Sequence, residues 1–397
     1  MSVEVDGREG LSKGDFNRLV SSGRLISVGS SSRDSRPLLV GEGVSTKVNA
    51  NVGTSTGKCD LKLEVAKAEV AVSAGADALM DLSIGGDLDK VRRMLLKKIP
   101  IPLGTVPVYQ VYFESKFEMN LDSILNVIER QARDGVDFMT IHAGIIQSFL
   151  KPMRKRIIPI TSRGGGFIAS WMLKHGRENP LYTGFDQILE VLKEYGVCLS
   201  LGDALRPGAI ADAHDNCQIG ELKILGKLTE RAWSVGVQVM VEGPGHVPIH
   251  MIEQDVVMQK KICHGAPYYV LGPLVTDIGL GHDHITSAIG GAIAASAGAD
   301  FLCYVTPSEH LGLPDIEDVR QGVVASKIAA HAGDIAKYGD MEKDIEMSRA
   351  RRKLDWEKMF DQALDPQIAK KYSCLTSKKE CSMCGEYCVL KLLGEDK

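Results

Sequence analysis

The amino-acid sequence lacks the features that would place a protein in a membrane or on nucleic acid. No apolar run approaches the ~20 residues that a membrane-spanning helix requires, and the polar, acidic segment Met1–Gly10 does not resemble a secretory signal. The formal net charge is −4, so there is no overall basic field for nucleic acid. Because the fractions of apolar and charged residues are ordinary, the sequence predicts a cytoplasmic globular protein.

A disulfide framework is not expected either, because cysteines in a reducing compartment rarely form structural disulfides. Five of the nine cysteines are scattered through the body, where we expect small buried side chains: Cys59, Cys198, Cys217, Cys263 and Cys303. The other four crowd near the end of the chain: Cys374, Cys381, Cys384 and Cys388. This terminal cluster needs an explanation of its own.

Short apolar runs alternate with longer amphipathic stretches beyond about residue 75. The predicted strands are Ala76–Leu82, Ile101–Val108, Asp137–His142, Ile157–Thr161, Val197–Leu201, Val237–Glu242, Tyr268–Leu271 and Phe301–Val305. Stretches between them have a helical period, namely Leu121–Arg133, Phe185–Tyr195 and Ile219–Val235. Alternating strands and helices predict a parallel sheet, and eight such units favour an α/β fold of the (β/α)8 TIM-barrel type. A doubly wound open sheet is the alternative, but its glycine fingerprint is missing.

The same pattern divides the chain into four predicted parts. Residues 1–60 are rich in Gly and Ser and form a small N-terminal lobe, and residues 61–314 form the catalytic barrel. Residues 315–372 form a helical arm, and residues 373–397 form a Cys-rich tail.

Unusual polar residues stand at or just after the ends of the runs. They are Asp81, Ser83, Tyr109, His142, Ser162, Arg163, Gly164, Asp203, Arg206, Glu242, His246, Tyr304 and His310. Any strand can end in a polar loop, but carboxylates, histidines, arginines and glycines are the groups of an active site rather than of an ordinary turn. Since a barrel places its active site at the carboxyl ends of its strands, we expect these residues to converge.

A glycine-rich loop, Ser162–Gly166, predicts an anion site. Glycines let backbone N–H groups converge, and Arg163 adds a charge that suits a phosphate. A helical stretch follows the loop, and its N-terminus would favour the same anion. Asp203 and Arg206 offer a further acceptor and a further cation. Together these groups predict a small phosphorylated substrate.

The strongest motif is the terminal Cys381-Ser-Met-Cys384-Gly-Glu-Tyr-Cys388. Thiolates at this density predict a zinc or iron–sulfur site. With three cysteine ligands, a 4Fe–4S cluster keeps one iron free for a substrate or for S-adenosylmethionine. A structural zinc site with Cys374 as the fourth ligand is the alternative.

Two histidines beyond predicted strands, His246 and His310, could share one divalent ion, because imidazole is the commonest side-chain metal ligand at neutral pH. Each has a carboxylate nearby in the sequence, Glu242 and Glu309. A further polar group follows the Tyr268–Leu271 run: Asp277, His282, Asp283 and His284. It suits either proton transfer or loop hydrogen bonding.

Taken together, these motifs resemble the phosphomethylpyrimidine synthase family over roughly residues 40 to 390. The matching strings include Val48–Gly53, Met80–Ser83, Gly104–Gln110, Ile141–Gly144, Ser162–Gly165, Asp203–Gly208, Glu242–His246, Leu271–Pro273, Asp283–Ala288, Cys303–Pro307, Glu309–Pro314 and Cys381–Cys384. The resemblance implies a radical S-adenosylmethionine lyase that converts 5-aminoimidazole ribotide to 4-amino-5-hydroxymethyl-2-methylpyrimidine phosphate in thiamine biosynthesis.

The resemblance also implies a role for individual residues. The substrate would contact Asn51, Met80, Tyr109, His142, Ser162, Arg163, Gly164, Asp203, Ala204, Leu205, Arg206, Glu242 and Tyr269. His246 and His310 would hold a divalent metal, for which zinc is expected. Cys381, Cys384 and Cys388 would bind a 4Fe–4S cluster. A homodimer, and an electron donor such as a flavodoxin or ferredoxin, would complete the system.

Some residues beside the predicted pocket depart from the usual family pattern, namely Ile84, Ala204 and Gly279–His282. The last cysteine gap is three residues, shorter than in long bacterial members. A sister enzyme, 5-hydroxybenzimidazole synthase of cobamide synthesis, shares the motifs and the ribotide and is therefore the alternative. A non-radical metal lyase with a structural zinc tail is a second alternative, from a different class.

Overall fold

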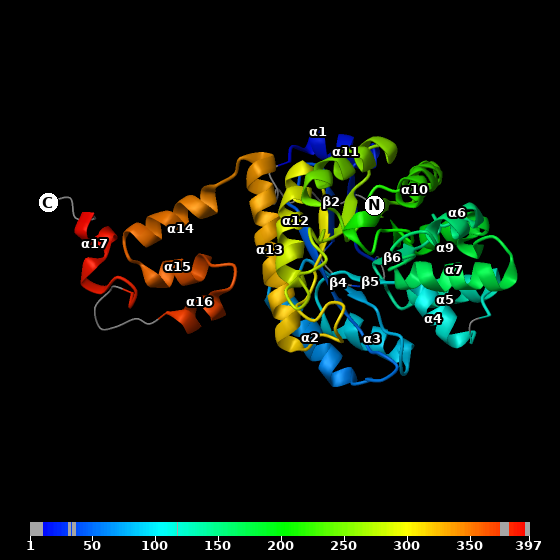
Figure 1. Cartoon of the computed structure of the whole chain (residues 1–397), viewed down its shortest axis with the longest axis horizontal. Helices are drawn as coiled ribbons and strands as arrows, with labels where there is room; N and C mark the ends of the chain where they lie inside the picture. The colour runs from blue at the N-terminus through cyan, green and yellow to red at the C-terminus, as the bar shows by residue number, and fades with distance from the viewer. Residues whose placement is uncertain (1–10, 31–32, 34–36, 117, 374–380, 394–397) are drawn as a thin grey trace. The chain divides into compact units, whose positions relative to one another are not determined.

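Eight parallel strands close into a barrel in the computed structural model of this chain, which confirms the predicted (β/α)8 fold (Figure 1). The structure describes residues 11–30, 33, 37–116, 118–373 and 381–393. The barrel strands are β3 (Lys47–Val52), β4 (Ala78–Asp81), β5 (Leu103–Thr105), β6 (Phe138–Ile141), β7 (Cys198–Leu201), β8 (Val239–Gly243), β9 (Tyr268–Leu271) and β10 (Phe301–Cys303). Each pairs with the next in the chain, and β10 pairs with β3 to close the barrel.

One predicted strand is wrong, and one barrel strand was not predicted. The run Ile157–Thr161 has an irregular, bent backbone, in which the N–H groups of Ile157 and Ile158 donate to the carboxylate of Asp212 at 3.1 and 3.0 Å. The missing strand is β3, which lies inside residues 1–60, the range that the sequence assigns to an N-terminal lobe. The barrel therefore begins before residue 61.

Amphipathic helices surround the barrel, and two of them match the sequence prediction at both ends, α5 (Leu121–Arg133) and α9 (Phe185–Tyr195). The capping box between Asn120 and Ser123 starts α5, whose apolar face is buried. The other helices of this part are α1 (Lys13–Ser21), α2 (Leu61–Ser73), α3 (Leu88–Lys98), α4 (Pro107–Glu114), α6 (Gln147–Met153), α7 (Arg163–His175), α8 (Pro180–Thr183), α10 (Asn216–Ser234), α11 (Ile252–Ile262), α12 (Asp283–Ala297) and α13 (Ile316–Tyr338), with the 3₁₀ turns η1 (Ile210–Asp212) and η2 (Ile249–Met251).

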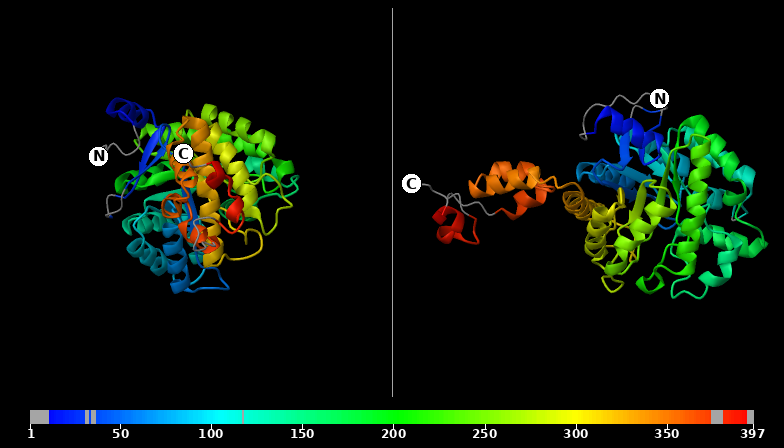
Figure 2. Two further views of the ribbon diagram at one scale, coloured as in Figure 1. Left: turned by 90° about the vertical axis from the view of Figure 1, so that its left-hand side faces the viewer. Right: turned by 90° about the horizontal axis from the view of Figure 1, so that it is seen from above.

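A two-stranded hairpin, β1 (Leu25–Val28) and β2 (Leu38–Gly41), covers the N-terminal end of the barrel. The backbone N–H of Ser27 donates to the Gln238 side chain at 2.7 Å, and that of Ser30 donates to Asp137 at 2.6 Å. Gln238 and Asp137 directly precede strands, so these bonds lie at the strand starts. The dark-blue N-terminal segment lies against the barrel in both views of Figure 2. The hairpin leaves the other end of the barrel, at the carboxyl ends of the strands, as the place where a functional site could form.

The chain divides into two compact units, residues 1–337 and residues 338–397. Most of α13, which the sequence assigns to the helical arm, belongs to the larger unit, where Lys327 and Asp77 form an ion pair at 3.0 Å. The smaller unit contains α14 (Glu342–Arg352), α15 (Trp356–Gln362), α16 (Pro366–Tyr372), η3 (Gly385–Tyr387) and α17 (Val389–Leu393). Over the described ranges, no helix combines the length and the apolar character that crossing a membrane requires.

Candidate functional site

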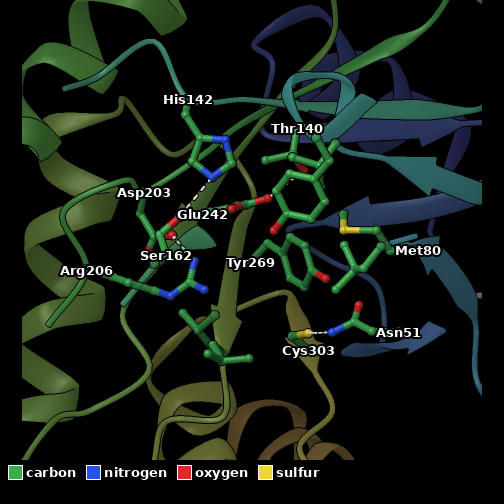
Figure 3. A pocket seen from close by; sticks show the side chains of 16 residues that line it. Asn51, Met80, Thr140, His142, Ser162, Asp203, Arg206, Glu242, Tyr269 and Cys303 are labelled. Atoms are coloured by element: carbon green, nitrogen blue, oxygen red, sulfur yellow. Dashed lines mark hydrogen bonds and ion pairs between the residues drawn. The ribbon is translucent and has the colours of Figure 1, made fainter. Parts of the chain in front are cut away.

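A cavity opens to solvent at the carboxyl ends of the barrel strands, with about 480 Å³ of empty space when its open mouth is included. Its walls consist of Asn51, Met80, Leu82, Val106, Tyr109, Thr140, His142, Ser162, Asp203, Arg206, Glu242, Gly243, Tyr269, Val270, Leu271 and Cys303. Figure 3 shows labelled side chains from all sides of the barrel pointing toward one space. Six of the strand-end residues singled out in the sequence line this cavity, as the fold predicts, namely Tyr109, His142, Ser162, Asp203, Arg206 and Glu242. The prediction was wrong for Asp81, Ser83 and Tyr304, which do not line it.

Nine predicted substrate contacts lie in the cavity wall, namely Asn51, Met80, Tyr109, His142, Ser162, Asp203, Arg206, Glu242 and Tyr269. The four others lie beside the wall. The Arg163 guanidinium stands 5.4 Å from the ring centroid of Tyr109. Gly164 packs so closely on His142 that an added Cβ would lie 2.4 Å from the imidazole. Ala204 and Leu205 are completely buried.

Acidic side chains and one guanidinium occupy one side of the cavity. Arg206 pairs with Asp203 at 3.0 Å. Glu242 accepts hydrogen bonds from the hydroxyls of Thr140 and Ser200 at 2.7 and 3.0 Å. Burial raises the pKa of Asp203 to about 8, although the charge of Arg206 opposes the shift. Burial also raises the pKa of Glu242. Asp203 is therefore poised to hold or release a proton near neutral pH.

His142 lies against the start of α7 and is held as a neutral imidazole. Its Nε2 lies 3.1 Å from the Ser162 hydroxyl, the contact drawn in Figure 3. Ser162 also caps α7 by accepting the N–H of Gly165 at 3.2 Å. Burial, reinforced by the charge of Arg206, lowers the pKa of His142 to about 3. The N-terminus of α7 therefore reaches the cavity edge, where it favours an anion.

A chain of amide, phenol and thiol groups forms the opposite side. Asn51 donates to the Cys303 sulfur at 3.1 Å, and Asn49 donates to the Tyr269 hydroxyl at 2.8 Å. Burial raises the pKa of Cys303 to about 11, so its side chain is a neutral thiol. The sequence prediction of Cys303 as a small buried side chain is right about burial but missed its place in the wall.

Sequence reasoning also missed the cavity-lining Thr140. Its position two residues before His142 carried the signal, because side chains at i and i+2 of a strand share a face. The remaining unpredicted wall residues are Leu82, Val106, Gly243, Val270, Leu271 and Cys303.

The two histidines singled out as metal ligands lie together beside the cavity. The ring centroids of His246 and His310 are 5.3 Å apart. Nδ1 of His246 lies 2.8 Å from Asp277, and Nδ1 of His310 lies 3.2 Å from Asp283. Carboxylates on Nδ1 orient imidazoles for metal binding through Nε2. The pair therefore suits a divalent ion, with Asp277 and Asp283 as orienting groups.

The cysteine motif in the smaller unit offers three thiols for the group predicted for it, although the described residues contain no arrangement of three or more Cys, His, Asp or Glu side chains that could already hold a metal ion. Backbone N–H groups of Cys384 and Met383 lower the pKa of the Cys381 thiol, so they favour its thiolate form. Gly385 has a φ of 50°, a left-handed conformation that tightens the turn between Cys384 and Cys388. Cys374, the fourth ligand of the zinc alternative, lies outside the described residues.

Comparison with known proteins places this geometry in a family. A family model described as the Radical SAM ThiC family matches residues 2–395. The chain is 55% identical over 372 residues to phosphomethylpyrimidine synthase of a Thermoanaerobacter species, covering 90% of this chain and 86% of that protein.

It is 50% identical over 406 residues to phosphomethylpyrimidine synthase of Moorella thermoacetica, covering 99% of this chain and 94% of that protein. A solved dihydropteroate synthase of Xanthomonas albilineans covers 79% of this chain, and this chain covers 100% of that one, with a TM-score of 0.48 and 14% identity, too low to bear on function. From the family match and the two close relatives, the chain belongs to the radical SAM ThiC family.

Proposed function

We propose that this chain is a phosphomethylpyrimidine synthase, which converts 5-aminoimidazole ribotide to the hydroxymethylpyrimidine phosphate of thiamine biosynthesis. The carrying observation is the identity of 50% to proteins of that name over nearly the whole of both chains. The names of these relatives favour the thiamine product over 5-hydroxybenzimidazole. Membership of a radical SAM family argues against a non-radical lyase with a zinc tail.

The phosphate of the substrate would lie at the N-terminus of α7. Ser162, Arg163 and Gly164 begin this helix, and a helix N-terminus favours an anion. Arg163 lies over the Tyr109 ring, which holds the guanidinium at the cavity edge. The hydrogen bond between Ser162 and His142 would fix the position of the loop that begins α7. Ala204 and Leu205 would act through the backbone that positions Asp203 and Arg206.

The base and ribose of the substrate would occupy the cavity itself. The hydroxyl groups of Thr140 and Ser200 donate hydrogen bonds to Glu242 and fix the orientation of its carboxyl group. Asn51 and Tyr269 offer an amide and a phenol across the cavity. Met80 closes the wall with an apolar side chain that excludes water.

Two further groups are proposed for the sites that fit them. His246 and His310 would hold a divalent metal, for which zinc is expected, and Cys381, Cys384 and Cys388 would hold a 4Fe–4S cluster. When bound, the reduced cluster and S-adenosylmethionine supply the 5′-deoxyadenosyl radical that abstracts hydrogen from the ribose. Three cysteines leave one iron for S-adenosylmethionine.

A homodimer is proposed as the working form, with a flavodoxin or ferredoxin as electron donor in the cytoplasm. Both follow from the family resemblance. Sedimentation of the reconstituted enzyme, and turnover with each donor in place of a chemical reductant, would test them.

The deciding experiment is anaerobic turnover with analysis of the products by mass spectrometry. The cluster is reconstituted and reduced, and S-adenosylmethionine and aminoimidazole ribotide are added. Hydroxymethylpyrimidine phosphate is the expected product. Formation of 5-hydroxybenzimidazole instead would move the enzyme to cobamide synthesis, and a colourless protein without deoxyadenosine formation would refute the radical assignment.

A further inference from the structure

Asn49 lies in the barrel interior, one layer deeper than the cavity wall. It precedes Asn51 by two positions on β3, so the two side chains point to the same face of the strand. Asn49 is completely buried and does not line the cavity, whereas Asn51 and Tyr269 do. The proposed function gives this buried amide no role.

The side-chain nitrogen of Asn49 uses both of its hydrogens on those two wall residues. Nδ2 donates to Asn51 Oδ1 at 2.9 Å and to the Tyr269 hydroxyl oxygen at 2.8 Å. An amide nitrogen has two donor hydrogens and no acceptor. Both partners of Asn49 must therefore accept from it.

The buried surroundings favour this orientation of the Asn49 amide over the reversed one. Its Oδ1 has no hydrogen-bond partner in the part of the chain that the structure describes. In the reversed amide, two buried N–H groups would stand at that position without acceptors, which costs more than one unpaired carbonyl oxygen. The reversed amide would also bring two carbonyl oxygens together, those of Asn49 and Asn51.

The orientation of Asn49 determines what its partners present to the cavity. Because Asn51 Oδ1 faces Asn49, the amide nitrogen of Asn51 points the other way and donates to the Cys303 sulfur at 3.1 Å, the contact drawn in Figure 3. That bond uses one N–H of Asn51 and leaves the second for a ligand. The Tyr269 oxygen accepts from Asn49, so its own O–H points away from Asn49. Both wall residues therefore offer donors.

Other contacts keep this part of the wall in place. The backbone N–H of Tyr304 donates to the Asn49 carbonyl at 2.9 Å, and the Tyr304 hydroxyl donates to the Asn51 carbonyl at 2.7 Å. Tyr304 thus fixes the backbone of β3, while Asn49 fixes the side chains. Burial raises the pKa of Tyr269 well above its usual range, so the phenol keeps its donor proton.

We propose that Asn49 is a positioning residue that fixes the hydrogen-bond polarity of Asn51 and Tyr269, so that this side of the cavity takes acceptor groups of the substrate. An unprotonated ring nitrogen or an oxygen of a ribotide is such a group. The proposal deepens the proposed function and rests on it for the identity of the ligand. The polarity itself is a property of the ligand-free chain.

Infrared spectroscopy of the full-length protein without ligand tests the polarity in the S–H stretching region. Asn49→Asp keeps the shape but puts an acceptor where the nitrogen donated, so Asn51 should turn to donate to it and present its own oxygen to Cys303. The Cys303 thiol then changes from acceptor to donor, and its S–H band should move to lower wavenumber. Loss of the band in Cys303→Ala identifies it. An unmoved band in Asn49→Asp would overturn the proposal.

Calorimetry with the ribotide measures the effect on binding. In Asn49→Asp both donors are reversed, so we expect Kd to rise by about 10- to 100-fold. Thr229→Val is a matched control, because that hydroxyl is also completely buried but bonds the Leu225 carbonyl of its own helix at 2.9 Å. It should leave Kd within about two-fold of wild type and the Cys303 band unmoved. Equal losses in the two variants would assign the effect to packing.

A double-mutant cycle tests whether Asn49 acts through Asn51. In a chain that carries Asn51→Ala, the substitution Asn49→Asp should raise Kd by clearly less than it does in the wild-type chain, because one of its two partners is gone. Full additivity of the two losses would show that Asn49 does not act through Asn51, and the proposal would be rejected.

A second variant covers the case in which Asn49→Asp does not fold. Asn49→Leu has a similar size and no donor, so Asn51 loses its fixed orientation. The Cys303 band should broaden and ribotide binding should weaken, and an unchanged band would count against the proposal. Because the infrared measurements need neither ligand nor turnover, failure of wild type to bind the ribotide or to make the pyrimidine phosphate would sink the proposed function without affecting them.

Discussion

Single aspartates at the starts of strands fix the register of the barrel. Asp77, Asp137 and Asp300 each directly precede a strand. Their carboxylates accept N–H groups at or near the starts of neighbouring strands: Val48 to Asp77 at 2.7 Å, Leu103 to Asp137 at 2.7 Å, and Tyr268 to Asp300 at 2.8 Å. A carboxylate that satisfies a strand-end donor prevents a one-residue slip, which would turn every side chain to the wrong face. These bonds lie at the N-terminal end of the barrel. They therefore help to set the strand register that places the cavity-wall side chains at the carboxyl end.

Asp137 offers the sharpest test of this role. It is fully buried and also accepts the N–H of Ser30 at 2.6 Å. Asp137→Ala should lower the free energy of unfolding by about 3–5 kcal/mol, because it leaves buried donors and the nearby Arg33 without their acceptor. Urea unfolding measures the loss. Asp77→Ala, whose side chain is 23% exposed, should cost clearly less, and an equal cost would contradict the account.

The buried neutral state of His142 predicts an acid-labile fold. Its pKa is about 3 in the folded chain and about 6.5 when unfolded. The unfolded state therefore binds the extra proton first, and stability is lost as pH falls from 6.5 toward 3. At pH 5 this amounts to about 2 kcal/mol. His142→Gln should remove that part of the acid sensitivity in urea unfolding at pH 5 and pH 7.5. If the free energy of unfolding of the variant depended on pH as strongly as that of wild type, this role of His142 would be disproved.

At the scale of elements, amphipathic helices were predictable and polar-lined strands were not. The residues of α5 and α9 alternate with the helical period, so both ends follow from the sequence. By contrast, β3 has the sequence Lys-Val-Asn-Ala-Asn-Val, with asparagines where an apolar run was sought. Those asparagines serve the cavity network. The apolar run that begins with Ile157 wrongly predicted a strand. The Ile157 side chain is 72% exposed and so does not belong to a buried strand.

Candidate site residues were predictable where a motif marked them at a strand end, as with Glu242. Thr140, inside a strand, was not predicted, because only the closed barrel brings its side chain into the cavity wall. Asp277 and Asp283 were noticed as a polar group, but their contacts with the two histidines required the fold.

The loops after β8 and β10 predict a metal site that is independent of iron. His246→Ala with His310→Ala should lower bound divalent metal about 10-fold or more while leaving iron unchanged. Elemental analysis after anaerobic reconstitution measures both. His264→Ala is a matched control, because that histidine pairs instead with Glu230 at 3.0 Å. Unchanged divalent metal in the double variant would defeat the two-histidine site.

At the scale of the whole molecule, the proposed substrate site and the proposed cluster ligands lie in different compact units. The cavity belongs to residues 1–337, and the cysteine motif belongs to residues 338–397. Under the proposed function, each unit would bind a different ligand. Loss of one function therefore need not entail loss of the other.

Cys384→Ala tests this separation. Cys384 is exposed, so its removal should leave the free energy of unfolding within about 0.5 kcal/mol of wild type. Iron content and deoxyadenosine formation should be abolished, whereas ribotide binding, followed by calorimetry, should persist. Cys59→Ala should retain full activity, because Cys59 is also exposed, contrary to the burial expected from the sequence. Wild-type turnover by Cys384→Ala under strict anaerobiosis would rule out the radical assignment.

The pairing of β10 with β3 has a consequence for the nascent chain on the ribosome. This seam joins Leu302 to Val48, so the barrel stays open until nearly the whole larger unit has been synthesised. Until then, the edge of β3 offers unpaired backbone groups to any other strand. The lysine that begins β3 is a charged residue of the kind that makes a strand edge a poorer template for aggregation, so it would protect the chain during its synthesis.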